Sequence, residues 1–130
     1  MNKRAEAGVE YKHNGCNCCQ AVLMAYSDVL NTEKDVLMSV GSGFGLGMGC
    51  MEGTCGALCG AVAAAGIMNN GENTRAAAKQ ILTSFKEKSG ATICKDLKGI
   101  ETGTMLCSCD DCVRNGIIAL AEAFPEKVTV

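Results

Sequence analysis

Apolar side chains recur along most of the chain at the three- and four-residue spacing of amphipathic helices, and almost nowhere with the alternation of a strand. This periodicity predicts helices over residues 17–30, 32–40, 54–69 and 73–89, a short helical turn within residues 92–99, and a final helix that Pro125 ends. Only residues 127–130, with the sequence KVTV, have strand character. The pattern therefore predicts an all-α fold.

The predicted third helix differs from the others because it is apolar on nearly every side. Residues 55–68 form the longest apolar run and are rich in Ala and Gly, which is typical of a central helix surrounded by others. Gly56 and Gly60, four residues apart, would let a neighbouring backbone come close. We expect Val62 and Ala65 to be almost completely buried. The predicted fold is a compact bundle of about five helices around this Ala/Gly-rich helix.

Length, composition and charge fit a single domain over residues 1–130 and exclude two classes of partner. The 12 basic and 14 acidic residues are interspersed, and without a basic stripe we expect no nucleic-acid binding. The longest apolar run has 14 residues, whereas spanning a membrane takes about 20. The charged N-terminal stretch lacks the apolar run of a secretory signal. We therefore expect a cytoplasmic protein without a membrane span.

Ten cysteines are the strongest chemical signal in the sequence. In a reducing cytosol they indicate metal or redox chemistry rather than a disulfide framework. A loop with six glycines, residues 41–53, precedes the central helix. This loop is either a tight connection or a set of backbone N–H groups that hold an anion or a cluster.

Four cysteines follow a favoured helix-capping residue by one or two positions. The pairs are Asn17 with Cys18, Thr54 with Cys55, Thr92 with Cys94, and Asp110 with Cys112. The unpaired N–H groups and the dipole of a helix start stabilise a thiolate, which is both the nucleophile and the metal ligand. We expect the pKa of Cys55 to be lowered most. The alternative is that these cysteines only fill the core as small apolar side chains.

Four motifs in the same regions carry a family resemblance. They are NCCQAV at residues 17–22, GTCGALCGA at 53–61, CKDLKG at 94–99 and CDDCV at 109–113. Through them, the chain from residue 15 to about 121 resembles the redox-active proteins named for a C-GCAxxG-C-C pattern. The resemblance implies four redox-active cysteines, which are also the candidate metal ligands. These signature cysteines are Cys18, Cys55, Cys94 and Cys112.

The sequence also adds residues to the family pattern. Six further cysteines are present: Cys16, Cys19, Cys50, Cys59, Cys107 and Cys109. We expect Cys16 and Cys50 to join the signature cysteines, because each lies just ahead of a signature helix. The glycines around Cys55, namely Gly53, Gly56 and Gly60, are the candidates for contacting a cofactor.

Two functions from different classes fit these features. As an electron-transfer module, the protein would gather the signature cysteines around an iron–sulfur cluster, or around zinc in a structural role, and exchange electrons with a redox partner protein. As a thiol–disulfide enzyme or sensor without metal, it would cycle the same sulfurs against a partner protein or a small thiol. A helical bundle with inert cysteines is the third alternative. Both the electron-transfer and the thiol–disulfide function require the signature cysteines to lie close together.

Overall fold

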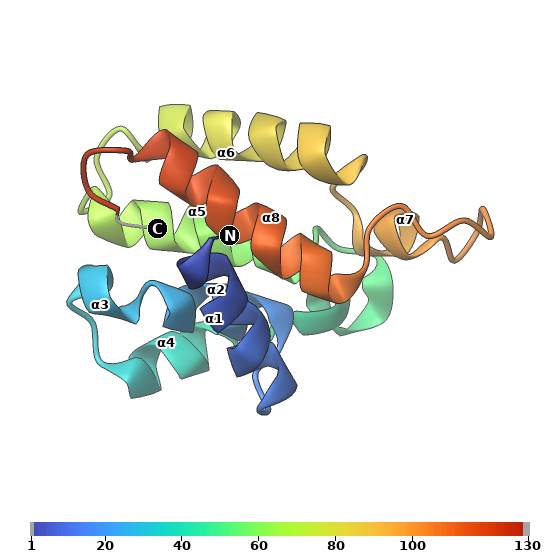
Figure 1. Ribbon diagram of the computed structural model, residues 1–130, viewed down its shortest axis with the longest axis horizontal. Coiled ribbons are helices and arrows are strands. Elements are labelled where there is room, and N and C mark those ends of the chain that lie inside the picture. The colour runs from blue at the N-terminus through green and yellow to red at the C-terminus, as the bar shows by residue number, and fades with distance from the viewer. Residues whose placement is uncertain (1, 129–130) are drawn as a thin grey trace.

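The computed structural model describes residues 2–128, and within this range it is built from helices without a β-strand (Figure 1). The helical segments are α1 (Lys3–His13), α2 (Cys18–Ala25), α3 (Ser27–Leu30), α4 (Lys34–Gly41), η1 (Gly47–Met51), α5 (Gly56–Met68), α6 (Thr74–Ser89), α7 (Cys94–Lys98) and α8 (Cys109–Ala123). The all-α prediction is confirmed, but the described residues contain nine helical segments instead of about five. Lys127 and Val128 form no strand, and Thr129 and Val130 lie outside the described residues.

The Ala/Gly-rich helix α5 packs against α2, α6 and α8 (Figure 1). Its buried residues are Gly56, Ala57, Leu58, Gly60, Ala61, Ala64 and Ala65. Ala65 is completely buried as predicted, but Val62 is only partly buried. The prediction for Val62 is wrong because it shares with Ala63 and Ile67 a side of α5 that the packed helices leave partly open. Within the described residues, no helix has both the length and the apolar character that crossing a membrane requires.

Glycine lets α2 and α8 pack directly against the backbone of α5. A Cβ atom on Gly60 would lie 2.8 Å from the Cys19 carbonyl oxygen and 3.1 Å from the Val22 Cβ atom. On α8, a Cβ atom on Gly116 would lie 2.9 Å from the carbonyl oxygen of Ala57. Side chains at these two positions would push the helices apart.

The first helix, α1, was not predicted from the sequence. Asn2 caps it, because its side-chain oxygen accepts a hydrogen bond from the Ala5 amide at 2.9 Å. The buried residues of α1 are Ala5, Gly8 and Val9, which have helical spacing but too little apolar surface to give a clear periodic signal. The helix packs against α2 and α8.

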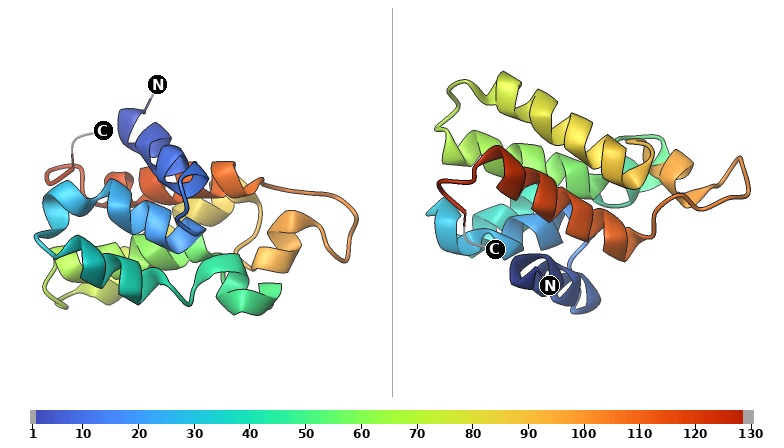
Figure 2. Two further views of the ribbon diagram at one scale, coloured as in Figure 1. Left: turned by 90° about the horizontal axis from the view of Figure 1, so that it is seen from below. Right: turned by 45° about the horizontal axis from the view of Figure 1, so that its top comes forward.

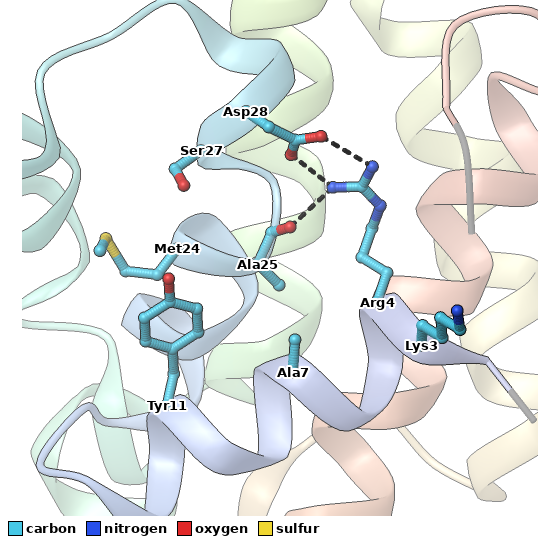
Figure 3. A pocket seen from close by; sticks show the side chains of 8 residues that line it. All are labelled: Lys3, Arg4, Ala7, Tyr11, Met24, Ala25, Ser27 and Asp28. Carbon is cyan, nitrogen blue, oxygen red and sulfur yellow. Dashed lines mark hydrogen bonds and ion pairs between the residues drawn. The ribbon is translucent and has the colours of Figure 1, made fainter.

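Arg4 ties α1 to the junction of α2 and α3 (Figure 3). Its guanidinium donates to both carboxylate oxygens of Asp28, at 2.6 and 3.0 Å, and to the Ala25 carbonyl at 2.7 Å. It also lies 4.7 Å from the centroid of the Tyr26 ring, in a cation–π arrangement. The buried Tyr26 hydroxyl donates to the Ile117 carbonyl of α8 at 2.5 Å. The single helix predicted here breaks at Tyr26 into α2 and α3.

At one end of the molecule, α7 lies beside η1, as both views in Figure 2 show. α7 and the loop after it project beyond the ends of α5 and α8 (Figure 1). These short segments are separated from each other by more than forty residues in the chain, and they meet at the end of the bundle where the cysteines gather.

A matched pair of substitutions on α5 tests the role of close helix packing. We expect Gly60→Ala to lower the free energy of unfolding by about 1–2 kcal/mol, because the new methyl group meets the α2 backbone. Gly66→Ala on the same helix should raise it by up to about 1 kcal/mol, since its Cβ would meet only Thr74 Cγ2 at 3.8 Å. Urea denaturation followed by circular dichroism measures both, and equal effects of the two substitutions would contradict the packing argument.

Candidate functional site

A cavity of about 270 Å³ lies where the N-terminal ends of α2, α5, α7 and α8 come together. Six cysteines line it: Cys16, Cys18, Cys55, Cys94, Cys109 and Cys112. The other lining residues are Lys12, Asn17, Leu46, Gly56 and Lys98. The structure thus brings all four signature cysteines to one cavity, which we call the cysteine cavity. A larger pocket of about 370 Å³ beside Arg4 is lined by no cysteine (Figure 3).

Backbone hydrogen bonds hold Cys55 next to Cys94. The Cys55 amide donates to the Thr92 carbonyl at 2.8 Å, and the Cys94 amide donates to the Gly53 carbonyl at 3.0 Å. Between these bonds, Thr54 takes part in a single antiparallel β-bridge. Thr54 and Thr92 therefore belong to a short extended pairing and cap no helix, which corrects the prediction for both.

The predicted cap at Asn17 is present and places Cys18 at the start of α2. The Asn17 side chain accepts from the Gln20 amide at 2.8 Å, and the Gln20 side chain accepts from the Asn17 amide at 2.9 Å. Cys18 is consequently the first residue of a helix with a complete capping box. Cys55, by contrast, occupies the N-cap position of α5 itself.

Helix α8 begins earlier than the predicted cap at Asp110 implied. Ser108 caps it, because its hydroxyl accepts from the Asp111 amide at 3.1 Å. Cys109 is then the first residue of α8, and Cys112 lies one turn inside it, with its amide bonded to the Ser108 carbonyl at 2.8 Å. Both thiols reach the cysteine cavity from the same end of the helix.

Three signature thiols interact in series, and this interaction raises the pKa of two of them, Cys55 and Cys18. A hydrogen bond with Cys112 is the main reason that the pKa of Cys55 is raised to about 12, although its contact with Cys18 and the Ala57 amide act in the opposite direction. A hydrogen bond with Cys55, followed by burial, raises the pKa of Cys18 far above its ordinary value. The prediction that the helix starts lower these pKa values, that of Cys55 most, is therefore wrong for the metal-free protein.

Cys94 also has a raised pKa, and here burial is the largest cause. The nearby ammonium group of Lys98 partly offsets the effect of burial, whereas Cys109 and Cys18 add to it. Buried thiols resist ionisation because the charged form loses its hydration. Without a bound cation, Cys94 therefore favours the neutral thiol, as do Cys18 and Cys55.

The glycine-rich loop forms part of the cavity wall in a left-handed conformation. Leu46, Gly47, Met48 and Gly49 all have positive φ, between 54 and 80°. A Cβ atom on Gly47 would lie 2.5 Å from the Cβ atom of Cys94, so this position requires glycine for space as well as for conformation. The backbone N–H of Leu46 points to the Cys18 sulfur and acts to lower its pKa.

The three glycines predicted to contact a cofactor have different positions. Gly56 lines the cysteine cavity. Neither Gly53 nor Gly60 lines it: Gly60 packs against α2, and Gly53 bonds to Cys94 through its carbonyl.

Lys98 places an ammonium group in the cavity wall. Its Nζ atom donates to the Cys107 carbonyl at 2.9 Å and lies 3.5 Å from the Cys112 sulfur. Burial alone lowers the pKa of Lys98, but the sulfurs of Cys112 and Cys109 raise it by more, and the net shift is upward.

The four remaining cysteines lie away from the cavity lining. Cys19 and Cys107 are buried, Cys59 is partly buried, and Cys50 is exposed with its thiol 3.8 Å from the Gly47 carbonyl. Of the two extra members expected from the sequence, the structure puts Cys16 on the cavity wall and Cys50 outside it. All ten cysteines are free thiols.

Comparison with known proteins fits this arrangement. A sequence model of the family described as "Putative redox-active protein (C_GCAxxG_C_C)" matches residues 16–123. The chain belongs to this family. The match contains all four signature cysteines and every cysteine of the cavity. Searches of curated proteins and of solved structures find no match.

The sequence spacing had paired Cys109 with Cys112 on condition that the last helix begins early, as it does, but it had not indicated Lys98 as a member of the site. Lys98 follows Cys94 by four residues on α7, a spacing that puts two side chains on one face of a helix. That spacing could have indicated a lysine beside the signature cysteines.

Burial and raised pKa together predict the order of thiol reactivity. In the folded, metal-free protein we expect iodoacetamide to modify the exposed Cys50 more than about tenfold faster at pH 7 than Cys55, which is 3% exposed. Because the pKa of Cys55 is raised to about 12, its thiolate fraction and its rate should grow as the pH rises from 7 to 9. Residue-resolved mass spectrometry measures both rates. Labelling of Cys55 as fast as Cys50 in the folded chain, with similar rates in urea, would contradict this description.

Proposed function

We propose that the protein is an electron-transfer module whose cysteine cavity binds an iron–sulfur cluster through Cys18, Cys55, Cys94 and Cys112. The observation that carries the proposal is the convergence of these four cysteines, from four separate segments of the chain, on one cavity. Membership of a family described as redox-active supports it. Bound here, an iron–sulfur cluster would supply one-electron transfer between a reduced carrier protein and an oxidised one.

The size of the cavity favours a cluster over a single metal ion. Zinc requires four ligands whose sulfur atoms lie about 2.3 Å from one point. Among the described residues, no three or more His, Cys, Asp or Glu side chains converge in that way. The signature cysteines instead surround a space of about 270 Å³, and soft thiolates are the ligands that iron–sulfur clusters prefer. Zinc is the alternative, and it would require the four side chains to close inward.

The chain itself would contribute fixed ligands, shielding from water and positive charge. The backbone pairing between Cys55 and Cys94 fixes the relative positions of two ligands before any group binds. Cys112 is fully buried, and Cys55 and Cys94 are nearly so. Lys98 and the Leu46 amide offset negative charge on the sulfurs.

A thiol–disulfide function is the second candidate, and the contacts between the thiols of Cys18, Cys55 and Cys112 favour it. Forming a disulfide between Cys55 and either Cys18 or Cys112 would release two electrons and two protons to an oxidised partner, such as a small-molecule disulfide. The raised pKa values weigh against rapid exchange, because the thiolate is the attacking species. Either function would suit the reducing cytosol, which keeps free thiols reduced.

Anaerobic reconstitution with iron and sulfide tests the cluster directly. We expect the wild-type chain to retain both elements and to show a visible charge-transfer spectrum. Cys55→Ser should lower the affinity for iron by at least about tenfold, because a ligand is lost. Cys50→Ser is the matched control and should leave the binding unchanged, because Cys50 lies outside the cavity.

Metal analysis and thermal melting of each variant separate ligand loss from unfolding. Equal iron and sulfide in Cys55→Ser and the wild type would contradict the proposed ligand set. Binding of zinc in place of iron would favour the structural alternative.

A further inference from the structure

Lys98 has an unusual environment for a lysine. It ends α7, lines the cysteine cavity, and donates to the Cys107 carbonyl and to the Cys112 sulfur. Three lysines in the described chain are partly buried, namely Lys12, Lys95 and Lys98. Two of them pair with carboxylates: Lys12 with Asp110, and Lys95 with Glu52 and Glu101.

Among the described residues, no carboxylate forms an ion pair with Lys98. Taking an ammonium group partly out of water is unfavourable unless negative charge compensates it. The groups that interact with Lys98 are the Cys107 carbonyl and the sulfurs of Cys112 and Cys109, and of these only the sulfurs can become anions. The position of Lys98 is therefore complementary to negative charge on the cavity sulfurs.

We propose that Lys98 is a positioning residue that raises the reduction potential of the cysteine cavity by holding a positive charge against the Cys112 sulfur. The identity of the redox group, an iron–sulfur cluster or a disulfide, rests on the proposed function. We expect Lys98 to raise the reduction potential in either case. In a cluster ligated by Cys112, the reduced form carries one additional electron. In a Cys55–Cys112 disulfide, two electrons break the S–S bond and leave two sulfur anions; the anion on Cys55 takes a proton from water, and the anion on Cys112 lies beside the Lys98 ammonium group.

In both couples the reduced form carries more negative charge beside Lys98, so the ammonium group stabilises that form. Removing a charge-assisted contact of this kind changes an equilibrium by about tenfold. A tenfold change corresponds to about 59 mV for a one-electron couple and about 30 mV for a two-electron couple.

Three variants of α7 isolate the charge from the structure. Lys98→Gln removes the charge but keeps an N–H donor for the Cys107 carbonyl, and Lys98→Arg keeps the charge. Lys95→Met is the matched control, since Lys95 lies three residues away on the same helix but does not line the cavity. Helical circular dichroism and thermal melting show whether each variant is folded.

The measurement is the midpoint potential, by dithionite titration of the chain reconstituted with iron and sulfide, or in dithiothreitol buffers if it takes up no cluster. We expect Lys98→Gln to shift the equilibrium about tenfold toward the oxidised form, while Lys98→Arg and Lys95→Met stay within about threefold of the wild type. If Lys98→Gln does not fold, Lys98→Met replaces it.

The outcomes distinguish this proposal from the proposed function. A wild type without iron contradicts the cluster, and the shift is then measured on the disulfide couple. A folded Lys98→Gln with the wild-type potential overturns the role of Lys98 even if a cluster binds. An equal shift in Lys98→Arg would also overturn it, because the charge is retained. A folded chain that neither binds an iron–sulfur cluster nor forms a disulfide in the cavity contradicts both proposals.

Discussion

The close approach of α2 to α5 is the constraint on which both the core and the cysteine cavity depend. A Cβ atom on Gly60 would meet the α2 backbone, and one on Gly56 would lie 2.5 Å from the Cys18 sulfur. The two glycines therefore have related but separate effects. Gly60 lets the helices pack at backbone distance, and Gly56 leaves the space into which the Cys18 thiol extends beside Cys55. Helix α5, which lies at the centre of the core, therefore also lines the cysteine cavity through Gly56.

Hydrogen bonds between thiols, together with burial, outweigh the helix start in setting the pKa values of Cys55 and Cys18. A helix terminus stabilises a neighbouring charge by about 0.3–1 kcal/mol, and by about 2 kcal/mol in favourable geometries. Removing an ion from water costs several kcal/mol. Cys55 occupies the N-cap of α5, but its thiol forms a hydrogen bond with the Cys112 thiol and is only 3% exposed, so its pKa rises. In such a cavity, a thiolate becomes favourable only with a nearby cation, and that cation can be a metal or an ammonium group.

The sequence was sufficient to predict the long helices, because α5, α6 and α8 carry either continuous or periodic apolar residues. It was insufficient for α1, where Ala5 and Gly8 replace the large apolar residues that reveal a helix face. The site shows the same division. That the four signature cysteines share a cavity could be predicted from motif resemblance, but the pairing of Thr54 with the chain before Cys94 could not. That pairing joins segments about forty residues apart, and neither segment has strand periodicity.

The structure also divides the ten cysteines by role. Those at the starts of helices, such as Cys18 and Cys94, line the cavity and interact with other sulfurs or with Lys98. Cys19, one residue after Cys18, points instead into the core and is 1% exposed, as expected for a small apolar residue. Adjacent residues of a helix point about 100° apart, so the side chains of Cys18 and Cys19 necessarily face different parts of the molecule. Counting cysteines therefore overstates the number available for chemistry. A position at or near a helix start identifies five of the six that face the cavity, and Cys16, in the connection before α2, is the sixth.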